Sequence, residues 1–570
     1  MMSTPLRSSL LIAAYYLIVG TFADRAAGRY PFTEGAIVRA TLVVFIVASI
    51  AWLAAVSCSP SPRFFDDAGA PDAGANSMPG WRLSWAVRAG GGENDWEPGT
   101  MDVREAGLSV VALEDGCSYL GGQAAEAAVF GEGEPNETHF LDEYVEWSDG
   151  FVARYYQDGS LEWVRRIGGD GEDHAKGVAA ADNGSAVVAG WFRSTEIVLG
   201  EGEPNETVLA SPLEASTGYL AKYRSDGELG WAVQIPQTDE TNLYAHTVHV
   251  LSDGRILVSG TLRGTAWPGE PFEVVSETSD SPSEWDSYLA WFDTQGEAVS
   301  AIRIGGDVQT THHHAVVALE DGSAVAAMAY GYDEVFGKGE PNETTLSCAL
   351  QEDDCDCASL ARYSAEGSLE WVRDLGVMKA REWTVELSEP ASVIVTGCFH
   401  LAPSNPELNP SEFALGEDEV GSLVAQFDVD DGDLQWSRFA RSDSCFDEMY
   451  TITPIPGGGG VSGMPFFQSL EFEGLDAGQR VLASDGKYDI ALVRFSATGE
   501  ILWMYGMGNG GNEGAGSSAQ LDGSSIWLTG YYSSNPFVAG SGHDDDVVLP
   551  LDGYTDIFLM RFDATSSPSE

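Results

Sequence analysis

A repeat with a period near 70 residues constrains the fold of this chain more than any other feature of its sequence. Segments such as Ser160–Gly169, with Trp163 in the middle, and Ser368–Gly376, with Trp371, recur along the chain. Their centres are residues 85, 163, 231, 300, 371, 436 and 503, which lie 65 to 78 residues apart, and all but Ser300 are tryptophan. A fixed period of this kind indicates an array of equivalent structural units.

Each unit contains the pattern of four short strands. An alternating apolar and polar segment such as Phe151–Tyr155 precedes the tryptophan segment, and a glycine-containing turn joins the two. A second hairpin lies earlier in the unit, as in 177–190, which turns at Asp182-Asn183-Gly184. Alternation with a period of two and Asn-Gly or Asp-Gly turns are typical of β-hairpins. No segment has a sustained helical period, so the sequence predicts an all-β fold.

Small four-stranded antiparallel sheets need neighbours to cover both of their faces, and radial stacking provides them. We therefore expect residues 81–565 to form a seven-bladed β-propeller. The first repeat begins with a tryptophan strand at Leu83–Ala89, and the last one ends with an aromatic strand near Phe562. Pairing of these two strands would leave no incomplete blade edge. The propeller is thus expected to be closed by the N-terminal strand joining the last blade.

The succession of Trp, Gly-Gly, Asp, a Gly-containing hairpin and a Phe-Val-Ala-Arg-Tyr-like strand resembles bacterial β-propeller repeats of the SBBP type. The resemblance covers roughly residues 83–563, and Pro454–Gly460 departs most from the pattern. It implies the fold and an extracytoplasmic setting. It implies no catalytic residue, because these repeats share no catalytic motif.

The N-terminal region carries the pattern of a targeting segment. An apolar run without charge spans Ala40–Val56, follows Arg39 and ends at Ser57-Cys58. A basic residue, an apolar core and small residues before a cysteine are typical of a signal peptide. This segment resembles a bacterial lipoprotein signal, which implies that Cys58 is acylated and that Ser59 directs the protein to the outer membrane or cell surface.

The expected organisation follows from that signal. Residues 1–58 are a targeting region, in which 1–37 is an upstream over-extension, and 59–80 form a flexible linker rich in Ala, Gly, Asp and Pro. Residues 566–570 form a short tail. The alternative is that Leu10–Ala23 and the second run form two membrane helices, which would anchor an external propeller in the inner membrane.

The chain carries a formal charge of −59, from 88 acidic and 29 basic residues. Such a charge repels phosphate and so excludes nucleic acid as a partner. It favours solubility at high salt, or a cation, a polysaccharide or a basic protein as partner. We expect a monomer.

Acidic loop segments are the candidate cation sites. Gly-Glu/Lys-Gly-Glu-Pro-Asn-Glu-Thr occurs three times between the second and third strands of a unit, at 131–138, 200–207 and 337–344. Carboxylate and amide oxygens suit Ca²⁺, although the alternative is a rigid solvated turn. We expect these inserts to share one acidic face with the loop at 168–173. The candidate metal ligands are Glu134, Asn136, Asp170, Glu172, Asp173, Glu203, Asn205, Glu340 and Asn342.

Cysteines are the candidates for disulfides, because an exported setting permits them. We expect Cys398 to pair with Cys445, and Cys348 to pair with Cys355 or Cys357. Cys117 is then left as a free thiol.

No catalytic motif stands out, so the sequence favours a non-catalytic exported binding or scaffold module, with Ca²⁺ as the candidate cation. The alternative is an exported propeller enzyme, either polysaccharide-processing or similar to quinone-dependent dehydrogenases.

Overall fold

The computed structural model describes residues 78–565 except 79, 92–104, 126, 141–146, 212–214, 277–284, 305–309, 331–332, 349–356, 378–379, 390, 401–403, 407, 409–413, 416–419, 443–449, 473–480 and 540–545. Two compact units divide the chain after Arg63, and every described residue belongs to the second. The targeting region with Cys58, nearly all of the linker and the tail lie outside the described residues. No helix of the described part has the length and hydropathy of a membrane span.

All regular elements of the described part are β-strands except one 3-10 turn at Asp182–Gly184. The strands form antiparallel sheets with a common order of an inner, a second, a third and an outer strand. The inner strands are β2 (Ala106–Ala112), β8 (Asp173–Ala181), β14 (Asn242–Val250), β20 (Thr310–Ala318), β26 (Ala380–Ser388), β30 (Thr451–Pro454) and β34 (Glu513–Gln520).

The second strands are β3 (Ser118–Ala124), β9 (Ser185–Phe192), β15 (Ile256–Arg263), β21 (Ala324–Tyr330), β27 (Ser392–Phe399), β31 (Gly460–Phe472) and β35 (Ser525–Tyr532). The third strands are β6 (Asp149–Tyr155), β12 (Thr217–Tyr223), β18 (Asp286–Phe292), β24 (Cys357–Tyr363), β28 (Val420–Asp428), β32 (Val481–Phe495) and β38 (Asp556–Ala564). The outer strands are β7 (Leu161–Ile167), β13 (Leu229–Gln234), β19 (Ala298–Ile304), β25 (Leu369–Val377), β29 (Leu434–Ser442), β33 (Ile501–Met507) and β1 (Trp81–Gly90).

Short hairpins follow the second strand in several sheets. They are β4 (Val129–Phe130) with β5 (Thr138–His139), β10 (Glu196–Leu199) with β11 (Thr207–Ala210), β16 (Thr265–Ala266) with β17 (Val274–Val275), β22 (Asp333–Phe336) with β23 (Thr344–Ser347), and β36 (Phe537–Ala539) with β37 (Val547–Leu549). We call them the insert hairpins.

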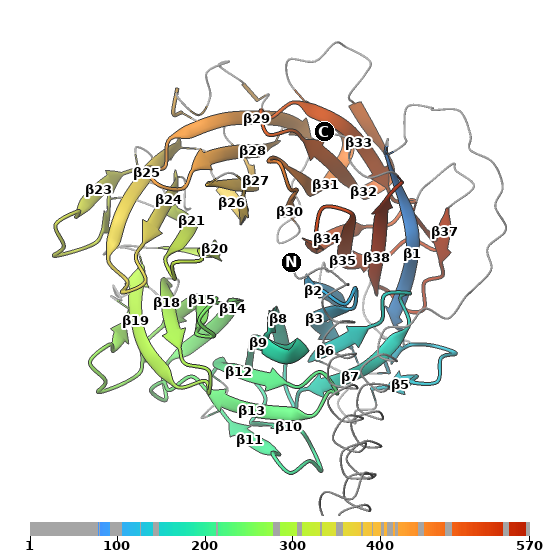
Figure 1. Cartoon of the computed structure of the whole chain (residues 1–570), viewed down its shortest axis with the longest axis horizontal. Helices are drawn as coiled ribbons and strands as arrows, with labels where there is room; N and C mark the ends of the chain where they lie inside the picture. The colour runs from blue at the N-terminus through green and yellow to red at the C-terminus, as the bar shows by residue number, and fades with distance from the viewer. Residues whose placement is uncertain are drawn as a thin grey trace, which may run out of the picture. The chain divides into compact units, whose positions relative to one another are not determined.

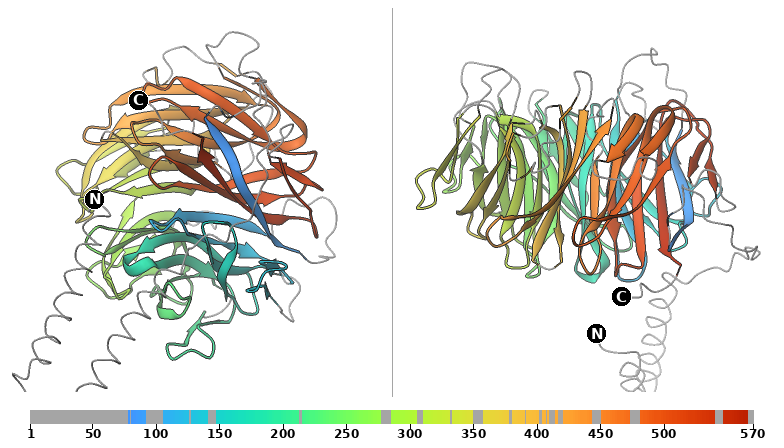
Figure 2. Two further views of the ribbon diagram at one scale, coloured as in Figure 1. Left: turned by 45° about the vertical axis from the view of Figure 1, so that its right-hand side comes forward. Right: turned by 90° about the horizontal axis from the view of Figure 1, so that it is seen from above.

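The sheets are arranged around a central axis with their inner strands towards the centre and the insert hairpins at the circumference (Figure 1). Seen from the side, the strands of neighbouring sheets stack face to face (Figure 2). The apolar core lies between the sheets, since one cluster joins Val187 and Leu220 of one sheet to Val258 and Ala290 of the next. This is the architecture of a β-propeller, and we call its sheets blades.

The first strand of the repeats pairs with the last strand, as the order of strands in the sequence predicts. β1 lies antiparallel to β38 over eight residue pairs, among them Leu83↔Phe562 and Ala89↔Ile557. The far end of β1 also pairs with an insert hairpin, through Ala89↔Phe130 of β4. β1 therefore joins sequence-distant parts of the chain on both of its edges.

The repeated tryptophans connect neighbouring blades. Trp163 donates a hydrogen bond of 2.9 Å from Nε1 to the carbonyl of Ser225, in the turn between the third and outer strands of the next blade. The same bond recurs in four other places. The pairs are Trp85 with Gln157 at 2.9 Å, Trp231 with Thr294 at 3.2 Å, Trp371 with Val429 at 3.1 Å and Trp436 with Ala497 at 3.0 Å.

The repeat that lacks its tryptophan replaces it on the neighbouring strand. Ser300 on β19 lies directly across from Trp291 on β18, and Trp291 is fully buried. Its Nε1 lies 3.4 Å from the carbonyl oxygen of Gly322, in the next blade. A large aromatic side chain thus still fills this space between two blades.

The segment that departs from the repeat pattern also departs in structure. β31 and β32 are the longest strands, at 13 and 15 residues. The end of β31 pairs with β29 of the preceding blade, through Arg441↔Glu471. Two blades therefore merge into one eight-stranded sheet.

Candidate functional site

The repeated Glu-Pro-Asn inserts bind the chain's own backbone. In the first copy, the Glu134 carboxylate accepts a hydrogen bond of 2.6 Å from the amide of Leu161, the first residue of β7. The Asn136 side-chain amide donates to the carbonyls of Leu161 and Glu162, at 3.1 and 2.9 Å. The insert therefore satisfies main-chain groups on the outer strand of its own blade.

The other two copies repeat this arrangement. Glu203 accepts from Leu229 at 2.6 Å, and Asn205 donates to Leu229 and Gly230. Glu340 accepts from Leu369 at 2.7 Å, and Asn342 donates to Leu369 and Glu370. Outer strands are exposed sheet edges, which proteins cover to prevent pairing with other chains.

This placement corrects the expectation of one acidic face. The insert tips reach the first residue of the outer strand in three blades, whereas the loop at 168–173 follows the last residue of an outer strand. The insert tips and that loop therefore lie at opposite ends of the blade, although the base of the second insert, at Thr195, contacts the loop. Sequence reasoning considered only the face on which an insert begins. It missed that the insert runs along the outer strand and binds the first residue of that strand.

A fourth insert, Trp267–Val274, has the same turn without the full motif. The amide of Gly269 donates to the Glu273 carboxylate at 2.6 Å, as Gly202 donates to Glu206 at 2.7 Å. Trp267 takes the left-handed conformation with φ of 52°, where the motif has Gly200 at 65°. The Gly-Glu-Pro-x-Glu spacing was the signal that could have identified this copy.

The loop at 168–173 also uses its carboxylates internally. Asp170 accepts from the amide and hydroxyl of Thr195, at 2.7 and 2.9 Å. Glu172 pairs with Arg193 at 2.5 Å. Asp173 is fully buried and accepts from Gly169 and Ser194. Among the described residues, no group of three or more His, Cys, Asp or Glu side chains could hold a metal ion. Calcium binding stays a prediction.

Sequence reasoning missed three pairs of buried acids at the boundaries between blades. Each pair joins an acid on a third strand, at the position that Asp149 occupies in its blade, to an acid at the start of the next blade's inner strand. The pairs are Asp149 with Asp173, Asp489 with Glu513, and Asp556 with Glu105. The register of the repeats, which places an acid at both positions, was the signal that could have found them.

Burial and repulsion by the partner acid raise the pKa of the inner-strand acid in each pair. Burial, with a smaller contribution from Asp149, raises the pKa of Asp173 to about 7. Burial raises the pKa of Glu513 to about 8, and the nearby Asp489 adds to this increase. In the third pair, Arg88 lies 3.0 Å from Asp556. Its positive charge partly offsets the increase in the pKa values of Asp556 and Glu105. Because these acids lie within the blade packing, their role is structural.

The cysteines differ in part from expectation. Cys348 is bonded to Cys357, the second of the two partners left open for it, and this disulfide closes a ten-residue segment. Cys355 and Cys445 lie outside the described residues, so the pairing of Cys398 with Cys445 stays a prediction. Cys117 is disulfide-bonded. The expectation of a free thiol there is wrong, because the pairings expected from the sequence left no partner for Cys117.

A concave site of the described part lies at the centre of the propeller. It is a cavity of about 700 Å³, and β2, β8, β14, β20, β26, β30 and β34 all contribute to its wall. Most of the wall is formed by small or aliphatic residues such as Val110, Val178 and Ala519. The cavity was not assigned any residue from sequence, because its wall consists of ordinary alternating strands.

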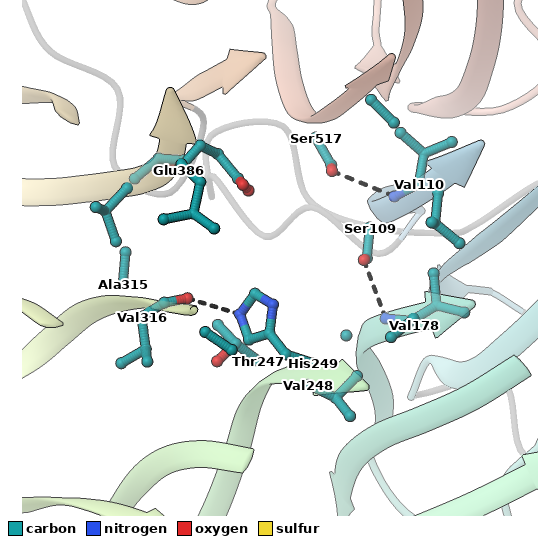
Figure 3. A pocket seen from close by; sticks show the side chains of 18 of the residues that line it. Ser109, Val110, Val178, Thr247, Val248, His249, Ala315, Val316, Glu386 and Ser517 are labelled. Atoms are coloured by element: carbon teal, nitrogen blue, oxygen red, sulfur yellow. Dashed lines mark hydrogen bonds between the residues drawn. The ribbon is translucent and has the colours of Figure 1, made fainter. Parts of the chain in front are cut away.

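Hydroxyl groups connect the inner strands around this cavity. Ser109 accepts from the amide of Val178 at 3.0 Å, and Ser517 accepts from the amide of Val110 at 3.2 Å. Both contacts are visible in Figure 3. These hydroxyls therefore bridge neighbouring blades.

Two ionisable side chains occupy the middle of the wall. Glu386 on β26 directs its carboxylate into the cavity (Figure 3), and burial raises its pKa to about 7. His249 on β14 lies 2.7 Å through Nε2 from the carbonyl oxygen of Val316, and burial lowers its pKa. A neutral His249 ring therefore donates one hydrogen bond and leaves the Glu386 charge uncompensated.

No protein-family model and no curated protein matches this chain. Solved structures with similar features include a protein of unknown function from Dyadobacter fermentans, with 12% identity over 85% of this chain and 100% of that chain, at a TM-score of 0.37. The Pan2 WD40 domain of Neurospora crassa has 9% identity, with coverage of 82% and 98% and a TM-score of 0.33. A europium-containing methanol dehydrogenase has 9% identity, with coverage of 85% and 93% and a TM-score of 0.32.

Proposed function

We propose that this chain is a non-catalytic binding module, a closed propeller of seven blades that takes its ligand in the central cavity and is held at the cell envelope. The observation that carries this proposal is the cavity itself, to which all of the inner strands contribute. A concave, largely apolar site with a few polar groups directed into it is the usual form of a ligand site.

Closure by β1 is supported by contacts at three radial positions. β1 pairs with β38 at the outside, and β4 adds two residue pairs to β1. At the centre, the amide of Val110 donates to Ser517 across the same boundary. Cysteines at the paired positions Ala86 and Met560 are expected to form an intramolecular disulfide. Failure of this disulfide to form under oxidising conditions would contradict closure, whereas Ala86→Cys with Leu502→Cys serves as the unpaired control.

The binding function is tested on the full-length chain by thermal shift with separate sets of organic cations, organic anions and oligosaccharides. At least one class is expected to raise the melting temperature in a saturable way. Ala519→Trp, which fills the cavity from β34, should abolish the shift. If no class has an effect, or if the shift survives Ala519→Trp, the cavity is not the binding site.

The location at the envelope rests on the resemblance of the N-terminal region to a lipoprotein signal. In the expected case, Cys58→Ala moves the protein from the membrane fraction to the soluble exported fraction and abolishes labelling by a radioactive fatty acid. Retention of both label and membrane association in the Cys58→Ala variant would refute the lipid anchor and favour the two membrane helices.

A further inference from the structure

The strand register places Glu386 in a defined layer of the cavity. Seven inner-strand positions are equivalent, because the same series of strand pairings connects each of them to a repeat position, 85, 163, 231, 300, 371, 436 or 503. In the first blade, for example, Trp163 pairs with Arg154 on the third strand, Arg154 with Tyr119 on the second strand, and Tyr119 with Val111 on the inner strand. The seven positions are Val111, Ala179, His249, Val317, Glu386, Thr453 and Ala519. Glu386 is the single carboxylate among these described positions. The repeat therefore does not require an acid at this position.

The other ionisable groups of the described wall do not neutralise Glu386. They are Lys176, His246, His249, Glu320 and Tyr450. His246 is within 3.1 Å of the Thr261 hydroxyl, and Glu320 is an exposed residue in the turn that follows β20. Lys176 lies in the earlier half of β8, away from the Ala179 layer. Among the described residues, the Glu386 carboxylate has neither a hydrogen bond nor an ion pair, and burial alone accounts for its raised pKa.

The remaining wall determines which ligand fits. Thr384 donates its hydroxyl to the carbonyl of Tyr450 at 2.6 Å, and Thr247 shares a hydrogen bond of 2.6 Å with Ser259. Ser109 and Ser517 are also used in bonds between strands. These bonds use part of the hydrogen-bonding capacity that the hydroxyls could offer a sugar, whereas the aliphatic side chains of the wall are available to contact an apolar body.

We propose that the cavity binds a small organic cation, an ammonium group on an apolar body, with Glu386 as its counter-ion. The inference rests on the proposed function, of which it names the ligand class. A charge-assisted hydrogen bond between ammonium and carboxylate is stronger than a hydrogen bond between neutral groups. The neutral His249 ring adds no competing positive charge.

The pH dependence of binding follows from the same pair of groups. The cation binds the ionised form of Glu386. Binding therefore releases a proton from those molecules in which the Glu386 carboxyl is protonated. With a pKa of about 7, the ionised fraction rises about tenfold between pH 6 and pH 8. The affinity for a ligand that is protonated throughout this range should rise by the same factor.

The experiment is calorimetric titration of the full-length chain with benzylamine and with benzyl alcohol, a neutral molecule of similar size. Benzylamine is expected to bind at pH 8 with a millimolar or lower dissociation constant. Glu386→Gln should weaken it at least tenfold and leave benzyl alcohol unchanged. Glu320→Gln, at the other carboxylate of the described wall, is the matched control and should bind benzylamine normally.

Three results would overturn the inference. They are absence of saturable benzylamine binding, binding by Glu386→Gln within twofold of the unmodified chain, and an unmodified-chain affinity that does not change between pH 6 and pH 8. The pH series needs no variant, so it decides the question even if Glu386→Gln fails to fold. If benzyl alcohol binds as well as benzylamine and Ala519→Trp abolishes both, the cation is refuted while the cavity function stands.

Discussion

The contact between a tryptophan and the turn glycine of the next blade allows a quantitative test. Gly227 has φ of 83°, and a Cβ atom there would lie 2.8 Å from Cδ2 of Trp163 and 2.8 Å from Nη2 of Arg165. Gly227→Ala therefore combines two penalties. The left-handed conformation costs alanine about 1–2 kcal/mol, and overpacking against a buried ring costs about 1–3 kcal/mol.

Gly202→Ala separates these two penalties. Gly202 has φ of 76°, and a Cβ atom there would have no heavy atom within 4 Å. It should lose only the conformational part, about 1–2 kcal/mol. The difference between the two variants, about 1–3 kcal/mol, is then the cost of crowding against Trp163 and Arg165.

The assay is equilibrium unfolding of the full-length chain in guanidinium chloride, followed by tryptophan fluorescence. Equal losses of stability in Gly227→Ala and Gly202→Ala would refute the reasoning, because the Trp163 contact would then carry no energy. A double variant of Gly227→Ala with Trp163→Leu should lose less than the sum of the single variants, since the smaller side chain relieves the overlap.

Three further predictions concern other parts of the repeat. Asn205→Ala should lower the free energy of unfolding by about 1–2 kcal/mol, and the loss should be the same in chelator and in calcium. Glu201→Gln, at an exposed residue, is the neutral control. A loss seen only with calcium would instead indicate that Asn205 is a metal ligand. Glu513 keeps its proton to about pH 8 in the folded chain and only to its ordinary value when unfolded, so stability falls as pH rises between these values. Glu513→Gln should therefore stabilise the chain at pH 8.5, by up to about 4 kcal/mol, and change little at pH 4; a pH-independent effect in denaturant titrations would contradict this. Trp291→Ala should cost about 3–5 kcal/mol, which thermal unfolding would detect, and a loss below 1 kcal/mol would mean that Trp291 does not replace the missing tryptophan.

The repeated features were predictable because they depend on local pattern. The alternating strands and the turn at Asp182-Asn183-Gly184 follow from side-chain period and glycine chemistry, and both occur in the structure. The pairing of β1 with β38 followed from the order of strands alone. Even the compensation by Trp291 could have been found, since the residue lies at a position of its strand where other repeats have Arg, Lys or Gln.

The candidate site was less predictable, because its chemistry depends on contacts between distant residues. Asn136 and Glu134 have the composition of a calcium loop, yet their partner Leu161 lies 25 and 27 residues further along the chain. Glu386 stands in an alternating strand, where an isolated acid usually faces solvent. Only the arrangement of all inner strands shows that it faces a cavity.

The pairing of β1 with β38 has a consequence for biogenesis. Ser84 and Asp563, which share a hydrogen bond at this seam, are 479 residues apart. At the usual speed of a ribosome, roughly 25–95 s separate the synthesis of the two strands. During that interval β1 is an edge without its partner, exposed to proteases and to other nascent copies. A chaperone that holds the newly made N-terminal segment would therefore improve the yield of this protein more than one that acts on the completed chain.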